Sequence, residues 1–267
     1  WVEKRLVNER LRENRWEEAA AELDRYLTFL RTCSAWWYAD HSFGNQDLEK
    51  WTSCSEIRHV LETKDHVTIC VESKERTWEL MIYPVVGGFR MVSGKKGFFD
   101  GKPEAFSMEE SEHAYIIRSK EHEMILQKET LEISIDRKAI TNLKNILFIF
   151  EKESVSASRI QFSIHENSAI YGFGERFDSV NQYGKTVALW QRDACEGCLA
   201  SIGNQAYKNI PLVHTSDGFS FFANTSYRMR MDVGGAVQDY LSVEALGDVF
   251  DFYIWSGTPR EALTAYG

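Results

Sequence analysis

Residues 67–84 read VTICVESKERTWELMIYP, and the apolar side chains in this stretch recur at every second position. Six residues carry the pattern on the two sides of a polar segment: Val67, Ile69, Val71, Trp78, Leu80 and Ile82. A period of two is typical of strands that bury one face. We therefore expect two half-buried antiparallel strands here.

The same alternation returns four times further along the chain. It is found in residues 131–135, 160–164, 229–233 and 250–254. Turn-forming Gly, Asp, Asn and Ser residues separate these segments, and no long helical pattern lies between them, which argues against a parallel sheet with crossover helices. The sequence predicts a mainly β fold, an antiparallel β-sandwich between about residues 50 and 255.

The beginning of the chain has a different period. Between Trp16 and Leu30 the apolar residues recur at spacings of three and four, which places them on one face of a helix. Asn14 followed by Glu17 suits the start of that helix. We expect a helix over about residues 14–32, packed on its own domain rather than used to bind a partner.

The last residues, SGTPREALTAYG, predict the start of another helix. Thr258 can cap it, Pro259 suits its first position, and Glu261 completes a capping box. Because this helix has only begun at Gly267, we expect the sequence to stop at the entrance of another domain, with a short terminal helix as the alternative. We therefore expect three parts: a helical segment (1–45), a β-sandwich (46–257) and the start of a connecting helix (258–267).

Composition limits the class of partner. The 267 residues carry a formal net charge of −9, which argues against nucleic acid, because phosphate binding needs clustered Lys and Arg. No run of about 18 apolar residues occurs, so we expect no transmembrane helix and no membrane partner. Five scattered cysteines favour a reducing compartment, the cytoplasm. The start at Trp1 leaves a removed leader open, and a homo-oligomer is open as well.

Short motifs in the chain give little chemistry by themselves. Cys195 and Cys198 form a C-x-x-C without a second ligand pair, so we expect loop cysteines and no metal, with a disulfide or redox pair as the alternative. The glycines of YGFGERF (171–177) lack the third glycine of a phosphate-binding loop, which favours a tight bend between strands. We find no nucleophile triad and expect no cofactor.

Residues 190–211 read WQRDACEGCLASIGNQAYKNIP, a weakly periodic segment between two strand-like stretches. Taken alone, these residues fit a metal site, a disulfide, a turn, or a loop that reaches out to hold a ligand. The residues by themselves therefore predict a β-sandwich with one polar-aromatic loop and leave the role of that loop open.

Six pieces in a fixed order give the segment 171–267 a family resemblance. They are YGFGERF, N-x-x-G at 181–184, WQRD at 190–193, AYKNIP at 206–211, a strand ending in FFAN at 221–224, and the closing FYIWSGTPREALTAYG. This segment resembles glycoside hydrolase family 31, the family of α-glucosidases and α-xylosidases. The resemblance implies a mutarotase-like supersandwich that packs against a catalytic (β/α)8 barrel downstream of this chain.

In this resemblance residues 190–211 form a substrate loop. Asp193 matches the family's loop aspartate, which hydrogen-bonds sugar hydroxyls near the scissile bond, and Tyr207 matches an aromatic at the mouth of the pocket. Arg192 could orient Asp193 or touch the substrate. The alternative is that Arg192 and Asp193 pair only to shape the loop.

The resemblance also implies a function. Two barrel aspartates about 5–5.5 Å apart hydrolyse the bond with retention in this family, so we expect no catalytic residue in this chain. We expect the N-terminal, substrate-shaping domain of a retaining α-glycosidase, α-xylosidase-like or α-glucosidase-like, which is inactive alone. Its partners would be an α-linked oligosaccharide and its own C-terminal barrel. The alternative is a non-catalytic carbohydrate-binding or structural β-sandwich module.

Overall fold

The computed structural model describes residues 15, 17–21, 51–73, 76–176, 179–190 and 206–267. Within these ranges the chain forms strands β1 to β19, a 3₁₀ turn η2 (Leu143–Asn145) and helix α4 (Pro259–Tyr266). Residues 17–21 are helical, as expected, while most of the helix expected over 14–32 lies outside the described residues. The registered strand pairs are antiparallel.

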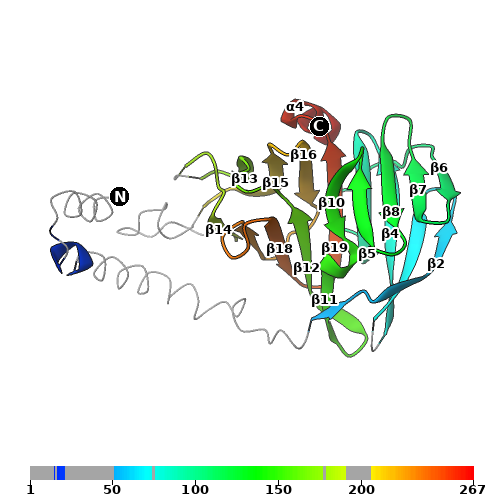
Figure 1. Ribbon diagram of the computed structural model, residues 1–267, viewed down its shortest axis with the longest axis horizontal. Coiled ribbons are helices and arrows are strands. Elements are labelled where there is room, and N and C mark those ends of the chain that lie inside the picture. Colours follow the sequence, from blue (N-terminus) through cyan, green and yellow to red (C-terminus); the bar gives the residue numbers. More distant parts are fainter. Residues whose placement is uncertain (1–14, 16, 22–50, 74–75, 177–178, 191–205) are drawn as a thin grey trace.

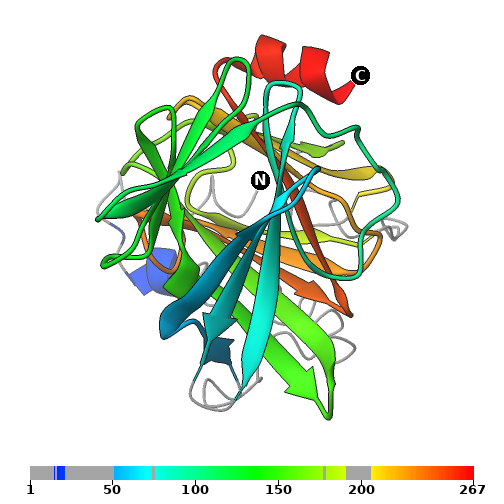
Figure 2. The same cartoon turned by 90° about the vertical axis from the view of Figure 1, so that its right-hand side faces the viewer.

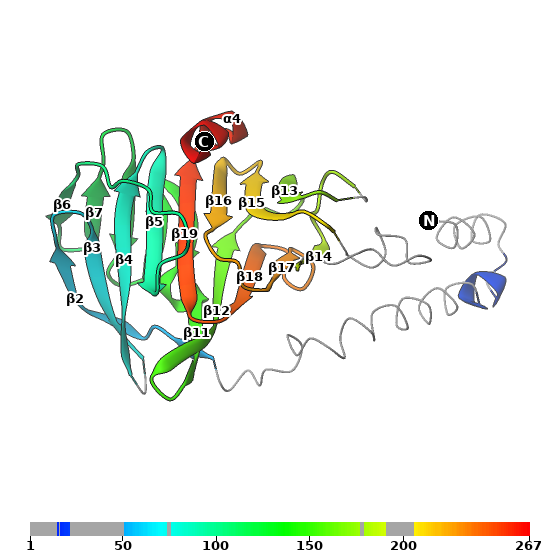
Figure 3. The same cartoon turned by 180° about the vertical axis from the view of Figure 1, so that it is seen from behind.

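The strands form three sheets, and Figure 3 shows the strands of the largest sheet side by side. The eight-stranded sheet has the order β13 (Ile170–Gly174), β15 (Asn209–Thr215), β16 (Phe219–Ala223), β19 (Val249–Ser256), β5 (Gly88–Gly94), β4 (Thr77–Val85), β3 (Val67–Glu72) and β2 (Glu56–Glu62). The six-stranded sheet has the order β1 (Thr52–Ser53), β11 (Ile146–Glu151), β12 (Ser154–Ser163), β18 (Tyr240–Leu246), β17 (Met229–Val233) and β14 (Lys185–Leu189). The five-stranded sheet has the order β10 (Lys138–Asn142), β9 (Glu132–Ile135), β8 (Glu123–Gln127), β7 (Ala114–Arg118) and β6 (Ser107–Glu110).

One continuous apolar core joins the three sheets. Phe162 of β12 stacks on Phe221 of β16 with ring centroids 4.4 Å apart, and Phe148 of β11 meets Phe250 of β19 edge to face. Ile133 of β9 belongs to the same buried cluster. Alternating side chains from facing sheets therefore fill the interior. The predicted antiparallel β-sandwich is confirmed.

Strand β19 differs from the sequence prediction, because it is buried on both faces rather than on one. Phe250, Phe252 and Ile254 lie in the main core, as the alternation indicates. The residues between them are buried as well, with Tyr253 and Trp255 in a second apolar cluster on the other face of the sheet. Helix α4 and the segment that follows β5 cover that second face. Alternation along one strand does not predict that other elements bury its second face.

Helix α4 covers one end of the sheets, as Figures 1 and 2 show. Its start is the capping box that the sequence predicts, since the Thr258 hydroxyl accepts from the Glu261 amide and the Glu261 carboxylate accepts from the Thr258 amide. The Glu261 carboxylate accepts from the amide and also from the hydroxyl of Thr258, and these two bonds lower its pKa below the ordinary value. Tyr266, in the last turn, meets the ring of Trp255 edge to face.

A buried ion pair lies on the outer face of β19. The guanidinium of Arg90, on β5, donates from Nε and Nη2 to the two carboxylate oxygens of Asp251, at 2.8 and 2.6 Å. Both side chains are almost fully buried. Burial alone opposes the charged guanidinium, but the hydrogen bonds and charge of Asp251 outweigh it, so the pKa of Arg90 lies above its ordinary value.

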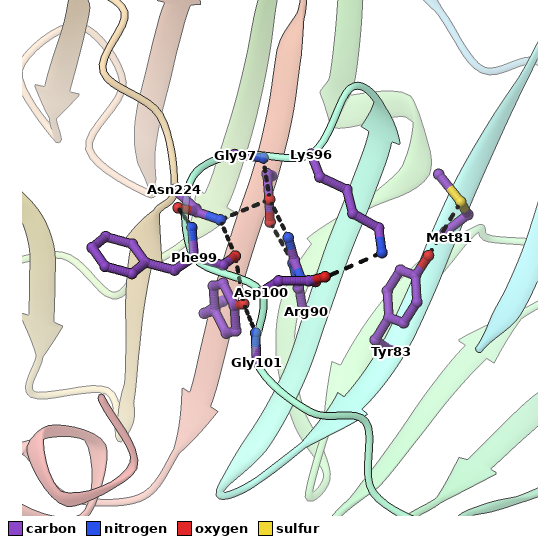
Figure 4. Close-up of polar contacts among 11 residues, drawn as sticks. Met81, Tyr83, Arg90, Lys96, Gly97, Phe99, Asp100, Gly101 and Asn224 are labelled. Carbon is purple, nitrogen blue, oxygen red and sulfur yellow. Dashed lines mark hydrogen bonds and ion pairs between the residues drawn. The ribbon is translucent and has the colours of Figure 1, made fainter. Parts of the chain in front are cut away.

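This ion pair also fastens the segment after β5, hereafter the clamp segment (residues 95–101), onto the sheet (Figure 4). Asp251 Oδ2 accepts from the Gly97 amide at 2.7 Å and from Asn224 Nδ2 at 2.8 Å. Asn224 in turn exchanges two hydrogen bonds with the backbone of Phe99. Gly97 is required at its position, because an added Cβ would lie 1.6 Å from the Asn224 carbonyl oxygen.

We expect Asp251→Ala to lower the free energy of unfolding by about 3–5 kcal/mol, because it removes the buried partner of Arg90 and leaves this buried charge with only an exposed carboxylate beside it. Asp100→Ala is the matched control. Asp100 accepts from the same guanidinium, yet its side chain is 67% exposed, so about 0–1 kcal/mol is expected. Urea unfolding measures both variants, and equal losses would contradict the assigned role of the buried pair.

Candidate functional site: the ends of the loop 190–208

Of the candidate substrate residues, only Tyr207 lies within the described ranges. Arg192 and Asp193, like Cys195 and Cys198, lie outside the described residues. Tyr207 is described and is 50% exposed, two residues before the start of strand β15 at Asn209. Trp190, at the other end of the loop, is also exposed and directly follows strand β14. Because β15 begins at Asn209, the loop expected over 190–211 ends at residue 208, and the structure describes how the two ends of this loop 190–208 are held.

The glycines of YGFGERF lie inside strand β13 rather than at a tight bend between strands. Gly172 and Gly174 have φ values of +115° and +84°, and the pairing of β13 with β15 changes register between them. A Cβ on Gly174 would lie 2.1 Å from the carbonyl oxygen of Lys208. Glycine therefore lets β13 approach the end of the loop closely, which the sequence interpretation of a simple bend did not include.

Arg176, the arginine of YGFGERF, contacts both ends of the loop. Its Nη2 donates to the carbonyl oxygen of Ala188 at 2.9 Å and to Oδ1 of Asn209 at 2.7 Å. Asn209 Nδ2 donates to the carbonyl oxygen of Ala206 at 3.1 Å. Figure 1 shows the three strands concerned, β13, β14 and β15, together at the end of the molecule away from β2.

The sequence analysis did not single out Arg176 and Asn209 as site residues. Both stood in the quoted motifs, YGFGERF and AYKNIP, so a signal was available. What the sequence could not provide is the register that places residue 176 between positions 188 and 209. That register depends on the bulge in β13.

Aromatic side chains and two hollows lie beside the ends of the loop. A hollow of about 440 Å³ is lined by Trp190, Asn209 and Tyr227, and a second of about 230 Å³ shares Asn209 and reaches Phe99. The guanidinium of Arg228 lies over the Trp190 ring, 4.5 Å from its centroid. Rings of this kind can pack on the C–H face of a sugar.

The described residues around these hollows can bind a ligand but bring no pair of carboxylates for hydrolysis. None of the described residues that line them is Asp, Glu or His. His214, further along β15, bonds to Ser220, and burial lowers its pKa, as suits a neutral structural histidine. In the described ranges no three His, Cys, Asp or Glu side chains gather as metal ligands. That Cys195 and Cys198 bind no metal stays a prediction.

Comparison with known proteins identifies the family. The sequence model described as "Glycosyl hydrolase 31 N-terminal galactose mutarotase-like domain" matches residues 59–232, which is more than half of the chain. The chain belongs to this family. The match includes the loop 190–208 and both strands that hold it. In the described part of the chain, no helix is long and apolar enough to cross a membrane.

Curated relatives and solved structures agree with this assignment. The chain is 34% identical over 113 residues to alpha-xylosidase XylQ of Lactiplantibacillus pentosus and 25% identical over 115 residues to an alpha-xylosidase of Emericella nidulans. These matches cover 42% and 43% of this chain and 14% of each relative, so the chain matches about a seventh of their length.

Two solved structures share the fold at low sequence identity. The cycloalternan-forming enzyme of Listeria monocytogenes, in complex with a pentasaccharide substrate, has a TM-score of 0.68 at 18% identity, over 78% of this chain and 21% of that chain. A family 31 dextranase of Flavobacterium johnsoniae has a TM-score of 0.61 at 16% identity, over 77% of this chain and 26% of that chain. Both show that the sandwich fold is the one these enzymes carry.

We expect Gly174→Ala to destabilise the protein more than Gly184→Ala does. Both glycines have φ near +80°, where a Cβ costs roughly 1–2 kcal/mol, but a Cβ on Gly184 would meet nothing within 4 Å. At Gly174 the contact with Lys208 adds about 1–3 kcal/mol. Urea unfolding of the two variants measures the difference. Equal losses would mean that β13 does not need this close approach.

Proposed function

We propose that this chain is the N-terminal, substrate-shaping domain of a retaining α-glycosidase, α-xylosidase-like or α-glucosidase-like, that acts on α-linked oligosaccharides. The observation that carries the proposal is the family match, which covers residues 59–232 and so includes the loop 190–208. Two relatives named alpha-xylosidase support the reaction class. The catalytic carboxylates would lie on a barrel, about 5–5.5 Å apart as retention requires.

Within this function the loop 190–208 contributes three substrate contacts. Asp193 would accept hydrogen bonds from two sugar hydroxyls beside the scissile bond, and Arg192 would orient that carboxylate or touch the sugar. Tyr207 would offer its ring at the mouth of the pocket. The half-exposed position of Tyr207 next to β15 supports its role, since a ring that packs on a sugar must be free of the core.

The second proposed partner is the catalytic barrel of the same protein. Exposed apolar side chains on neighbouring elements support it, because exposed apolar surface of this kind marks an interaction site. Five of them lie on helix α4, the clamp segment and the nearby β4–β5 turn: Val86, Phe98, Phe99, Leu263 and Tyr266. Between these elements lies a hollow of about 500 Å³ floored by Phe222, Tyr253 and Trp255.

We propose the same three parts as from the sequence: 1–45, 46–257 and 258–267. The strands from Thr52 to Ser256 and helix α4 after them support the second and the third part. For the compartment we propose the cytoplasm. In support, Cys54 and Cys70 are free and buried, and burial raises the pKa of the Cys54 thiol to about 11.

We expect the purified 267-residue chain to show no turnover of aryl α-glycosides, while the complete gene product is active, because the proposed catalytic carboxylates lie on the barrel. The assay follows release of the aryl group from both proteins at equal molar concentration. Turnover by the chain alone would place a catalytic pair within these residues and overturn the proposal.

We expect Asp193→Ala in the complete protein to lower kcat/KM roughly 5- to 150-fold, the loss that corresponds to about 1–3 kcal/mol for unpaired polar groups. The melting temperature should stay unchanged. The measurement compares a natural substrate with one that lacks the contacted hydroxyls, and the loss should be confined to the natural one. An unchanged kcat/KM with a lowered melting temperature would instead assign Asp193 to loop shape.

A further inference from the structure

Strand β14 ends at Leu189, strand β15 begins at Asn209, and one guanidinium contacts both places. Arg176 Nη2 bonds to Ala188, two residues before the exposed Trp190, and to Asn209, two residues after the exposed Tyr207. These strands do not pair with each other, since β14 is an edge of the six-stranded sheet and β15 belongs to the eight-stranded sheet. A side chain therefore bridges the gap between the two sheets.

Further contacts extend this bridge to the residues next to the loop. The Asn209 side chain accepts from Arg176 and donates to the Ala206 carbonyl. Arg176 is thereby linked, through Asn209, to the returning end of the loop. The Glu175 amide donates to the carbonyl of Lys208 at 2.9 Å. At the outgoing end, Trp190 lies against the guanidinium of Arg228.

We propose that Arg176 is a positioning residue, which fixes the end of β14 and the start of β15 relative to each other and thereby places Tyr207 against the substrate. This inference rests on the proposed function of the loop. A guanidinium is suited to the task because its donors point in fixed directions from a rigid plane. A lysine at this position has a single flexible ammonium and loses that fixed geometry.

The test is Arg176→Lys in the complete gene product, with Arg76→Lys as the matched control. Arg76 also donates to a backbone carbonyl, that of Lys152 at 3.1 Å, in the β11–β12 connection. We expect Arg176→Lys to lower kcat/KM for an aryl α-glycoside about 10- to 100-fold, because a small misplacement of a substrate contact has an effect of this size. Arg76→Lys should leave kcat/KM unchanged at a similar melting temperature.

A double mutant separates positioning from a general loss of stability. If Arg176 acts by placing Tyr207, adding Arg176→Lys to Tyr207→Ala should lower kcat/KM by less than the product of the two single effects. Full additivity of the two effects, or an unchanged kcat/KM for Arg176→Lys while Tyr207→Ala is impaired, would overturn the inference.

A readout without activity separates the inference from the proposed function. In the 267-residue chain we expect Arg176→Lys to speed amide hydrogen exchange in a peptide that covers residues 206–209, and Arg76→Lys to leave it unchanged. If Asp193→Ala and Tyr207→Ala both leave kcat/KM unchanged, the proposed substrate contacts of the loop fail, and this exchange alone decides the matter. Faster exchange then supports Arg176 as the tether of the loop, and unchanged exchange overturns it.

Discussion

Strand β19 must be covered on both faces, and much of the molecule follows from that constraint. Its core face carries Phe250, Phe252 and Ile254, which pack between the sheets. Its outer face carries Asp251, whose charge can be buried only because Arg90 and the clamp segment satisfy both carboxylate oxygens. The clamp segment and helix α4 then cover the remaining aromatic residues of this face. A buried ion pair thus determines where a surface element lies.

The same sheet leads from this pair to the candidate site. From β19 the order continues through β16 and β15 to the edge strand β13, so the returning end of the loop 190–208 belongs to the sheet that carries β19. The outgoing end follows β14 of the six-stranded sheet, and both sheets share one buried core. Asn224, at the end of β16, bonds to Asp251, and it borders the hollow that Asn209 also lines. A site supported by strands is placed more precisely than one supported only by loops.

The sequence was sufficient for the class of fold and for the family, but not for the cover of its sheets. Alternation in 67–84 and in four later segments predicted the sandwich, and the capping box at Thr258 was predicted residue by residue. Periodicity reports one strand at a time, so it missed that both faces of β19 are buried. The glycine pattern of YGFGERF predicted a bend. The bulge that the structure shows instead, and the position of Arg176, depend on pairing with residues more than thirty positions away, which the sequence does not reveal. For Asp193, Arg192 and the three-part division, the sequence interpretation remains a proposal.

The central claim is that this sandwich holds a loop against the sugar of an α-glycosidase. The most direct measurement is a crystal structure of the complete gene product with an unhydrolysed α-linked oligosaccharide bound. The account predicts a carboxylate oxygen of Asp193 within about 2.6–3.2 Å of a sugar hydroxyl, with the Tyr207 ring at the pocket mouth and Arg176 still joining Ala188 to Asn209. A bound sugar that contacts no residue of 190–208 would contradict it.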